Sequence, residues 1–125
     1  MIHLGSLIRA NNFPRLQELS LISNAINDLG LFELSQLMKY HFLPHLTTLY
    51  ISDNHLHDES VTELATVLQG NCITPAAELY IGCNAISPPV IQSLVSLLYS
   101  PSTEVAPLKN VVLEKSFRFF LVSYR

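Results

Sequence analysis

The sequence predicts an α/β fold in which strand–turn–helix units stack on one another as a solenoid. A frame of apolar residues around one asparagine occurs three times, at a spacing of thirty residues. Apolar residues alternate in the first half of each unit and take helical spacing in the second half. Because neither half of a unit can bury its apolar side alone, the units must pack against each other. A proline falls just before each predicted strand, at Pro14, Pro44, Pro75 and Pro107.

The strand half of each unit carries the frame. Its three copies are Leu16-x-x-Leu19-x-Leu21-x-x-Asn24-x-Ile26, Leu46-x-x-Leu49-x-Ile51-x-x-Asn54-x-Leu56 and Ala76-x-x-Leu79-x-Ile81-x-x-Asn84-x-Ile86. Residues two apart share one face of a strand, so we expect Leu19 and Leu21, with their equivalents, to point inward. The asparagine follows where the backbone turns sharply. Its carboxamide can both donate and accept, so stacked copies are expected to satisfy the turns of neighbouring units.

The second half of each unit predicts a helix with one apolar face. The apolar sets are Leu34, Leu37 and Met38; Leu64, Val67 and Leu68; and Leu94, Leu97 and Leu98. Offsets of three and four place each set on one side of a helix. We expect Asp28, Asp58 and Ser87 to be helix N-caps, and Gly70-Asn71 to end the second helix.

The units divide a single predicted domain of residues 1–125. Full repeats are expected at 16–45, 46–75 and 76–107, between a partial N-terminal helical half-repeat at 1–15 and an incomplete terminal repeat at 108–125. In the last of these, Leu108-x-x-Val111-x-Leu113 restarts the frame, but Ser116 replaces the asparagine. An apolar end left open in this way has two explanations. The chain is a fragment or a short gene product of a longer array, which we favour because uncapped edges are aggregation hazards, or the end docks another copy or another chain.

Composition narrows the class of protein. Of 125 residues, 49% are hydrophobic and 14% are charged, which argues against disorder. The net charge is −3 and the basic residues are scattered, which argues against a nucleic-acid partner. Cys72 and Cys83 suggest no disulfide framework, and no signal peptide or membrane span is evident. We therefore predict a soluble, cytoplasmic protein without a membrane partner.

The frame resembles the leucine-rich repeat, and units of thirty residues with full helices resemble its ribonuclease-inhibitor-like subclass. The resemblance covers about residues 16 to 107. It implies a horseshoe segment with parallel strands on the concave face and helices on the convex face. The sequence departs from the pattern at Ala76, which replaces a leucine, and at Ser60 and Val90, which take the position of Gly30.

Side chains between the inward leucines must point out of the concave sheet. Tyr50 and Tyr80 occupy one frame position in adjacent units, and tyrosines are enriched among binding hot spots. Alternatively, the two rings only stack as favourable neighbours in the sheet. The predicted partner contacts are Glu18, Ser20, Thr48, Tyr50, Ser52, Asp53, Glu78, Tyr80, Asn110 and Val112. The acidic members suit a basic partner segment.

No catalytic, cofactor or metal site is predicted. The segment 53–58 gathers possible metal ligands, but its spacing matches no zinc pattern, and His55 is expected to face solvent. Cys83 has no histidine in a neighbouring column that would activate its thiol. The predicted function is a non-catalytic protein–protein interaction module that binds a protein or peptide on its concave strand face. The alternatives are a regulator of a small GTPase, as in Ran GTPase-activating proteins, and a fragment that assembles into a longer solenoid.

Overall fold

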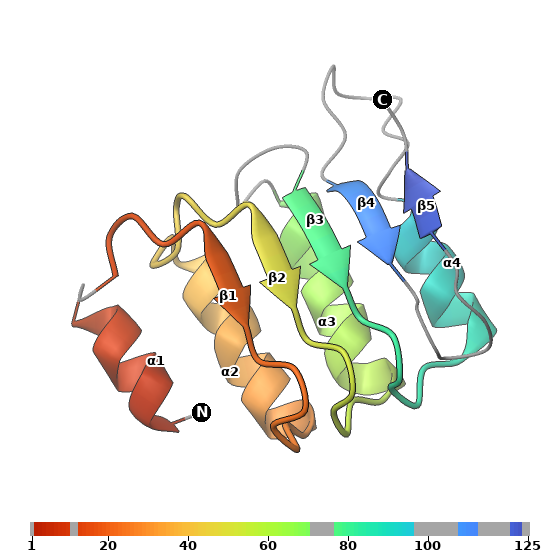
Figure 1. The fold of residues 1–125 in the computed structure, drawn as a ribbon, viewed down its shortest axis with the longest axis horizontal. Helices are drawn as coiled ribbons and strands as arrows, with labels where there is room; N and C mark the ends of the chain where they lie inside the picture. The colour runs from red at the N-terminus through yellow and green to blue at the C-terminus, as the bar shows by residue number, and fades with distance from the viewer. Residues whose placement is uncertain (1, 11–12, 71–76, 97–107, 113–120, 124–125) are drawn as a thin grey trace.

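The protein consists of a layer of strands and a layer of helices that alternate along the chain (Figure 1). The computed structural model describes residues 2–10, 13–70, 77–96, 108–112 and 121–123. Its helices are α1 (Ile2–Arg9), α2 (Asp28–Lys39), α3 (Asp58–Gln69) and α4 (Pro88–Ser96). Its strands are β1 (Glu18–Ser20), β2 (Thr48–Tyr50), β3 (Ala77–Tyr80), β4 (Leu108–Val112) and β5 (Leu121–Ser123). The predicted α/β class is confirmed.

The sheet has the strand order β1-β2-β3-β4-β5. Strands β1 to β4 pair in parallel, and α2, α3 and α4 lie behind them in Figure 1. β5 pairs antiparallel with β4, where the sequence predicted no strand. Several expectations concern residues outside the described parts of the chain: Asn71, Cys72, Pro75, Ala76, Leu97, Leu98, Pro107, Leu113 and Ser116.

The core lies between the sheet and the helices, as the frame predicts. In the second and third units the inward strand residues Leu49, Ile51, Leu79 and Ile81 are buried. The predicted apolar helix faces are buried as well, in the residues Leu34, Leu37, Met38, Leu64, Val67, Leu68 and Leu94. Ile8 of α1 joins the same cluster, so the helix layer extends beyond β1. Burial of these side chains is the main favourable term for stacking the units.

The asparagines connect adjacent turns, which confirms their predicted role. The Asn54 Oδ1 accepts hydrogen bonds from the backbone N–H groups of Asn24 (3.1 Å) and Ile26 (2.9 Å) in the preceding unit. Its Nδ2 donates to the carbonyl oxygens of Leu21 and Ile51, each at 3.0 Å. One buried carboxamide thereby pairs backbone groups from two units.

Asn84 repeats the arrangement one unit later. Its Oδ1 accepts from the N–H groups of Asn54 and Leu56, each at 3.2 Å. Its Nδ2 donates to Ile51 O in the preceding unit (3.1 Å) and to Ile81 O in its own (2.9 Å). The same four positions of the frame are therefore joined between units two and three as between units one and two.

The residue before each asparagine adopts the left-handed backbone conformation. Ser23, Asp53 and Cys83 have φ values of 57°, 56° and 55°. This region is uncommon for residues other than glycine, and aspartate tolerates it better than most. The three turns therefore share this conformation at the residue before the asparagine. Ala25 is also left-handed, with φ 53°, whereas its frame equivalents His55 and Ala85 are not.

Prolines in the described segments start tight turns into the strands. The Leu16 N–H donates to Phe13 O across Pro14, and the Leu46 N–H donates to Leu43 O across Pro44, both at 3.3 Å. Proline favours the second position of such a turn because its ring fixes φ near the required value. The prolines thus set the entry into β1 and β2.

Two of the predicted N-caps are wrong. Asn27, rather than Asp28, caps α2, because its side chain accepts a hydrogen bond from the Gly30 N–H at 3.0 Å. His57 occupies the N-cap position of α3 without a side-chain capping bond. Asp28 and Asp58 are the first residues of their helices, and their carboxylates bind the next unit instead.

The other predicted helix ends agree with the structure. Ser87 directly precedes α4, and its carbonyl oxygen accepts from the N–H groups of Val90 and Ile91, each at 3.1 Å. Gly70 is the C-cap of α3. Proline at the first helical position of α4 carries no N–H that would need a partner there.

Candidate functional site

The strand face, defined as the outward residues of β1 to β3 on the side away from the helices, presents two rows of aligned positions, and the pairing register continues both rows to β4. One row runs Glu18, Thr48, Glu78 and Asn110, and the other runs Ser20, Tyr50, Tyr80 and Val112. The pairing register confirms the predicted alignment of both rows. Figure 1 views the strands from this side, in front of the helices.

A stacked pair of aromatic rings lies at the centre of the strand face. The ring centroids of Tyr50 and Tyr80 are 4.5 Å apart, and their planes are inclined by 24°. Both residues are half-buried, so the rings retain contact with solvent. The Tyr80 hydroxyl donates to Glu78 Oε2 at 3.3 Å. The parallel register brings the rings together because residues in register on adjacent strands lie about 5 Å apart.

The described part of the strand face is acidic. Glu18 is exposed and Glu78 is half-buried, while β1, β2 and β3 carry no lysine, arginine or histidine. Asp53, at the turn after β2, is exposed, and its Oδ2 accepts a hydrogen bond from Ser23 Oγ at 2.6 Å. The field above these strands therefore attracts cations.

Thr48 and Ser52 are buried, although we expected them to contribute contact surface. Thr48 is 6% exposed and Ser52 is 4% exposed. Thr48 lies between the longer side chains of Glu18 and Glu78 in its row, which shield a short side chain from solvent. Both residues offer a partner little area.

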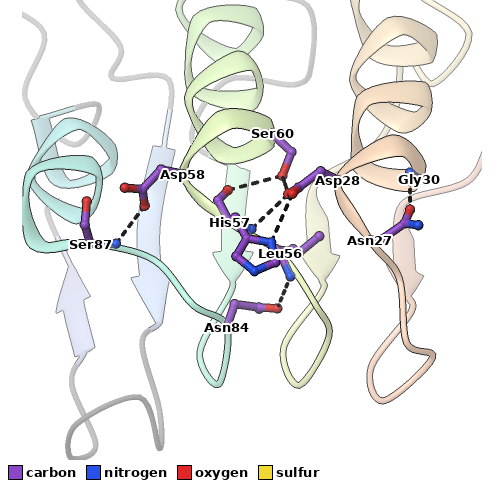
Figure 2. A network of polar contacts seen from close by, with 9 residues as sticks. All are labelled: Asn27, Asp28, Gly30, Leu56, His57, Asp58, Ser60, Asn84 and Ser87. Carbon is purple, nitrogen blue, oxygen red and sulfur yellow. Dashed lines mark hydrogen bonds and ion pairs between the residues drawn. The ribbon is translucent and has the colours of Figure 1, made fainter.

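A polar network joins the N-terminal ends of the helices, and sequence reasoning did not anticipate it (Figure 2). Asp28 Oδ1 accepts from the His57 N–H at 2.9 Å and from the Ser60 hydroxyl, and Asp28 Oδ2 lies 3.0 Å from His57 Nδ1. One unit later, Asp58 Oδ1 accepts from the Ser87 N–H at 2.7 Å. The recurrence of Asp28 as Asp58 thirty residues later was the signal for it in the sequence.

Hydrogen bonding sets the pKa values of both aspartates. Burial alone raises the pKa of Asp28, but the hydrogen bonds from Ser60 and His57 outweigh it and hold the pKa below its usual value of 3.8. Hydrogen bonds from the Ser87 side chain and backbone lower the pKa of Asp58. The same hydrogen bonds stabilise the charged carboxylates that join the units.

Aspartate, histidine and serine together invite comparison with a hydrolytic triad, but the geometry differs. In such a triad the imidazole lies between the carboxylate and the hydroxyl and takes the proton of the hydroxyl. Here the carboxylate of Asp28 lies between His57 and Ser60, and it accepts from both. Ser60 is also buried. The network therefore ties units together and does not activate a nucleophile.

The metal ligands that the sequence places in segment 53–58 do not converge. His55 is exposed, as expected. Over the residues that the structure describes, no group of three histidine, cysteine, aspartate or glutamate residues is placed to hold a metal ion. Cys83 lies half-buried at the turn after β3.

Comparison with known proteins gives one match, to a family of repeats. A family model described as Leucine Rich repeat matches residues 42–65, which include β2 and the first part of α3. The match, with the parallel strands and their helices, supports a leucine-rich repeat protein of α/β type. Such repeats generally mediate protein–protein interaction and are generally not enzymes. No significant match is found among curated proteins or solved structures. Among the described residues, no helix combines the length and apolar character that a membrane crossing requires.

Proposed function

We propose that the chain is a non-catalytic interaction module whose strand face binds a protein or peptide. The observation that carries the proposal is the stacked pair Tyr50–Tyr80, half-buried and in the middle of the described parallel strands. Tyrosines supply large contact areas with few rotatable bonds, and they are enriched among the residues that dominate binding energy. A pair already held in register loses little further freedom when a partner covers it.

The proposed contact surface surrounds this pair. Glu18, Ser20 and Asp53 are exposed, and Glu78 is half-buried next to the tyrosines. Asn110 and Val112 extend the two rows onto β4. In the full proposal these strands line the concave side of a solenoid segment of the ribonuclease-inhibitor-like kind, in a cytoplasmic protein. A concave sheet lets one partner touch several strands at once, which suits an extended segment.

The experiment is a selection of peptides from a random library displayed on phage. The native chain and a Tyr50→Ala/Tyr80→Ala variant serve as bait. A Tyr40→Ala/Phe42→Ala variant is the matched control, because it removes two exposed aromatic rings outside the strand face. Circular dichroism and urea unfolding establish that all three baits are folded.

We expect the native chain and the control to enrich the same peptides, and the strand-face variant to lose that enrichment at least tenfold. Equal enrichment by all three baits contradicts the proposed face. If the native chain enriches no peptide, the rings serve only as stacked neighbours in the sheet, and the proposed function is wrong.

A further inference from the structure

We infer that the strand face selects an arginine in an extended basic segment, with the guanidinium stacked on the Tyr50 ring above Ser20 and within reach of Glu18. This inference rests on the proposed function and names the chemistry of the partner. It follows from what lies on either side of Tyr50, from the distribution of charge, and from the small side chain on β1.

The two sides of Tyr50 in the sheet differ. On one side its ring stacks on Tyr80 at 4.5 Å. On the other side the register places Ser20, which is small and exposed. Adjacent strands lie about 4.8 Å apart, close to the separation of the stacked rings. A flat group above Ser20 would therefore add one layer to the existing stack.

One carboxylate lies within reach of this position. Glu18 is exposed and lies two residues before Ser20, on the same side of β1. Two residues along a strand span about 7 Å, a distance that the glutamate and arginine side chains cover together. On the other side of Tyr50, Glu78 is held by the Tyr80 hydroxyl at 3.3 Å. β1, β2 and β3 carry no basic residue, so the charge on these strands favours a cationic group from a partner.

Arginine fits this arrangement better than lysine does. Its guanidinium is planar, stacks on aromatic rings, and forms forked hydrogen bonds with a carboxylate. An ammonium group is more strongly hydrated and lacks the flat shape. Phosphate groups are disfavoured by the same carboxylates, which argues against nucleic acid at this face.

The phage selection described above provides the first test, since the inference expects arginine to be enriched in the selected peptides. One selected peptide is then synthesised with a fluorophore, and its affinity for the full chain is measured by anisotropy. Replacing its arginine by citrulline, which keeps the shape and removes the charge, should weaken binding about tenfold. Replacement by lysine should weaken binding about threefold.

The same binding measurement is made with two protein variants, each of which removes one negative charge. Glu18→Gln should weaken the arginine peptide about threefold to tenfold and leave the citrulline peptide unaffected. Glu59→Gln, at an exposed position on α3, should leave both affinities unchanged. Raising the salt concentration should reduce the difference between native and Glu18→Gln protein.

The outcomes separate this inference from the proposed function. Peptides that require Tyr50 and Tyr80 but show no arginine enrichment overturn the inference and leave the proposed function in place. The same holds if Glu18→Gln has no effect on the arginine peptide. Peptides that bind without the tyrosines contradict both.

Discussion

The first and second units share one frame, but their strand halves are buried to different extents. In the second unit Leu46 and Ile51 are each 1% exposed, whereas their equivalents Leu16 and Leu21 are only half-buried. The helix halves do not differ in this way, because α1 packs beside α2 while the described sheet begins at β1. Burial of a frame residue therefore depends on a neighbour in its own layer and not on the frame alone.

The asparagines of the two units also differ in burial, and the one in the second unit is again the more buried. Asn54 is buried and pairs backbone groups in two units. Asn24 is exposed, and its Nδ2 donates to Ile22 O within its own turn at 2.9 Å. Asparagines at the same frame position thus differ in burial and in hydrogen bonding according to their place in the stack.

The largest expected loss of stability comes from replacing one leucine of a unit by alanine. Leu46→Ala should lower the free energy of unfolding by about 2–5 kcal/mol, because it leaves a cavity in a closed core. Leu16→Ala should cost less than half as much, because Leu16 is half-buried. Urea unfolding followed by circular dichroism measures both. Equal losses would show that the two strand halves are packed alike.

The second largest loss of stability is expected from replacing the asparagines. Asn54→Ala should cost about 1–3 kcal/mol, because the N–H groups of Asn24 and Ile26 lose a buried acceptor. Asn24→Ala removes one exposed hydrogen bond and should cost about 0.5 kcal/mol. The same denaturation experiment compares them. A larger loss of stability for Asn24→Ala than for Asn54→Ala would contradict the greater structural role that we assign to Asn54.

A pH titration probes the connection between the two units through Asp28. Because the pKa of Asp28 is lower in the folded state than its usual 3.8, the carboxylate stabilises the fold above that value. That stabilisation is lost as the pH falls through the lower, folded pKa. We therefore expect the stability difference between native protein and Asp28→Asn to be full at pH 7 and to shrink below about pH 4.

The control for this titration is Glu18→Gln, an exposed charge change on β1 that has no part in the Asp28 network. Its stability difference from native protein should change less over the same range. A difference for Asp28→Asn that stays constant down to about pH 3 would mean that the carboxylate form is not what joins the units.

The smallest effect distinguishes two alanines at one frame position. The His55 and Ala85 N–H groups donate to Ile26 O and Leu56 O of the preceding units, at 2.8 and 2.9 Å. Ala25, in the first unit, is left-handed instead. Ala25→Gly should therefore raise stability by about 0.5 kcal/mol, and Ala85→Gly should lower it by a similar amount. Thermal unfolding midpoints that move in the same direction would contradict this account.

Repetition explains what the sequence could predict. The strand rows, the apolar helix faces and the asparagine contacts follow from residues that recur in register, since one unit constrains the next. The tyrosine alignment follows from the same register. Predicting these features requires only the local periodicity and the assumption that the units stack.

The features that sequence reasoning missed depend on partners far along the chain. Asp28 reads as an N-cap under local rules, yet its partners His57 and Ser60 lie 29 and 32 residues later. The burial of Thr48 depends on the size of the side chains on both adjacent strands. The pairing of β5 with β4 reverses the chain direction, so the parallel frame could not indicate it.

The two kinds of connection between units point in opposite directions along the chain. Asn54 reaches back to the amide of Ile26, while Asp28 reaches forward to the amide of His57. Local opening of the second unit therefore exposes amides on both sides of the boundary at once. In deuterated solvent these amides should exchange as one group, although they belong to different repeats. A ligand that holds β2 closed would then slow exchange in the turn of the first unit without touching it.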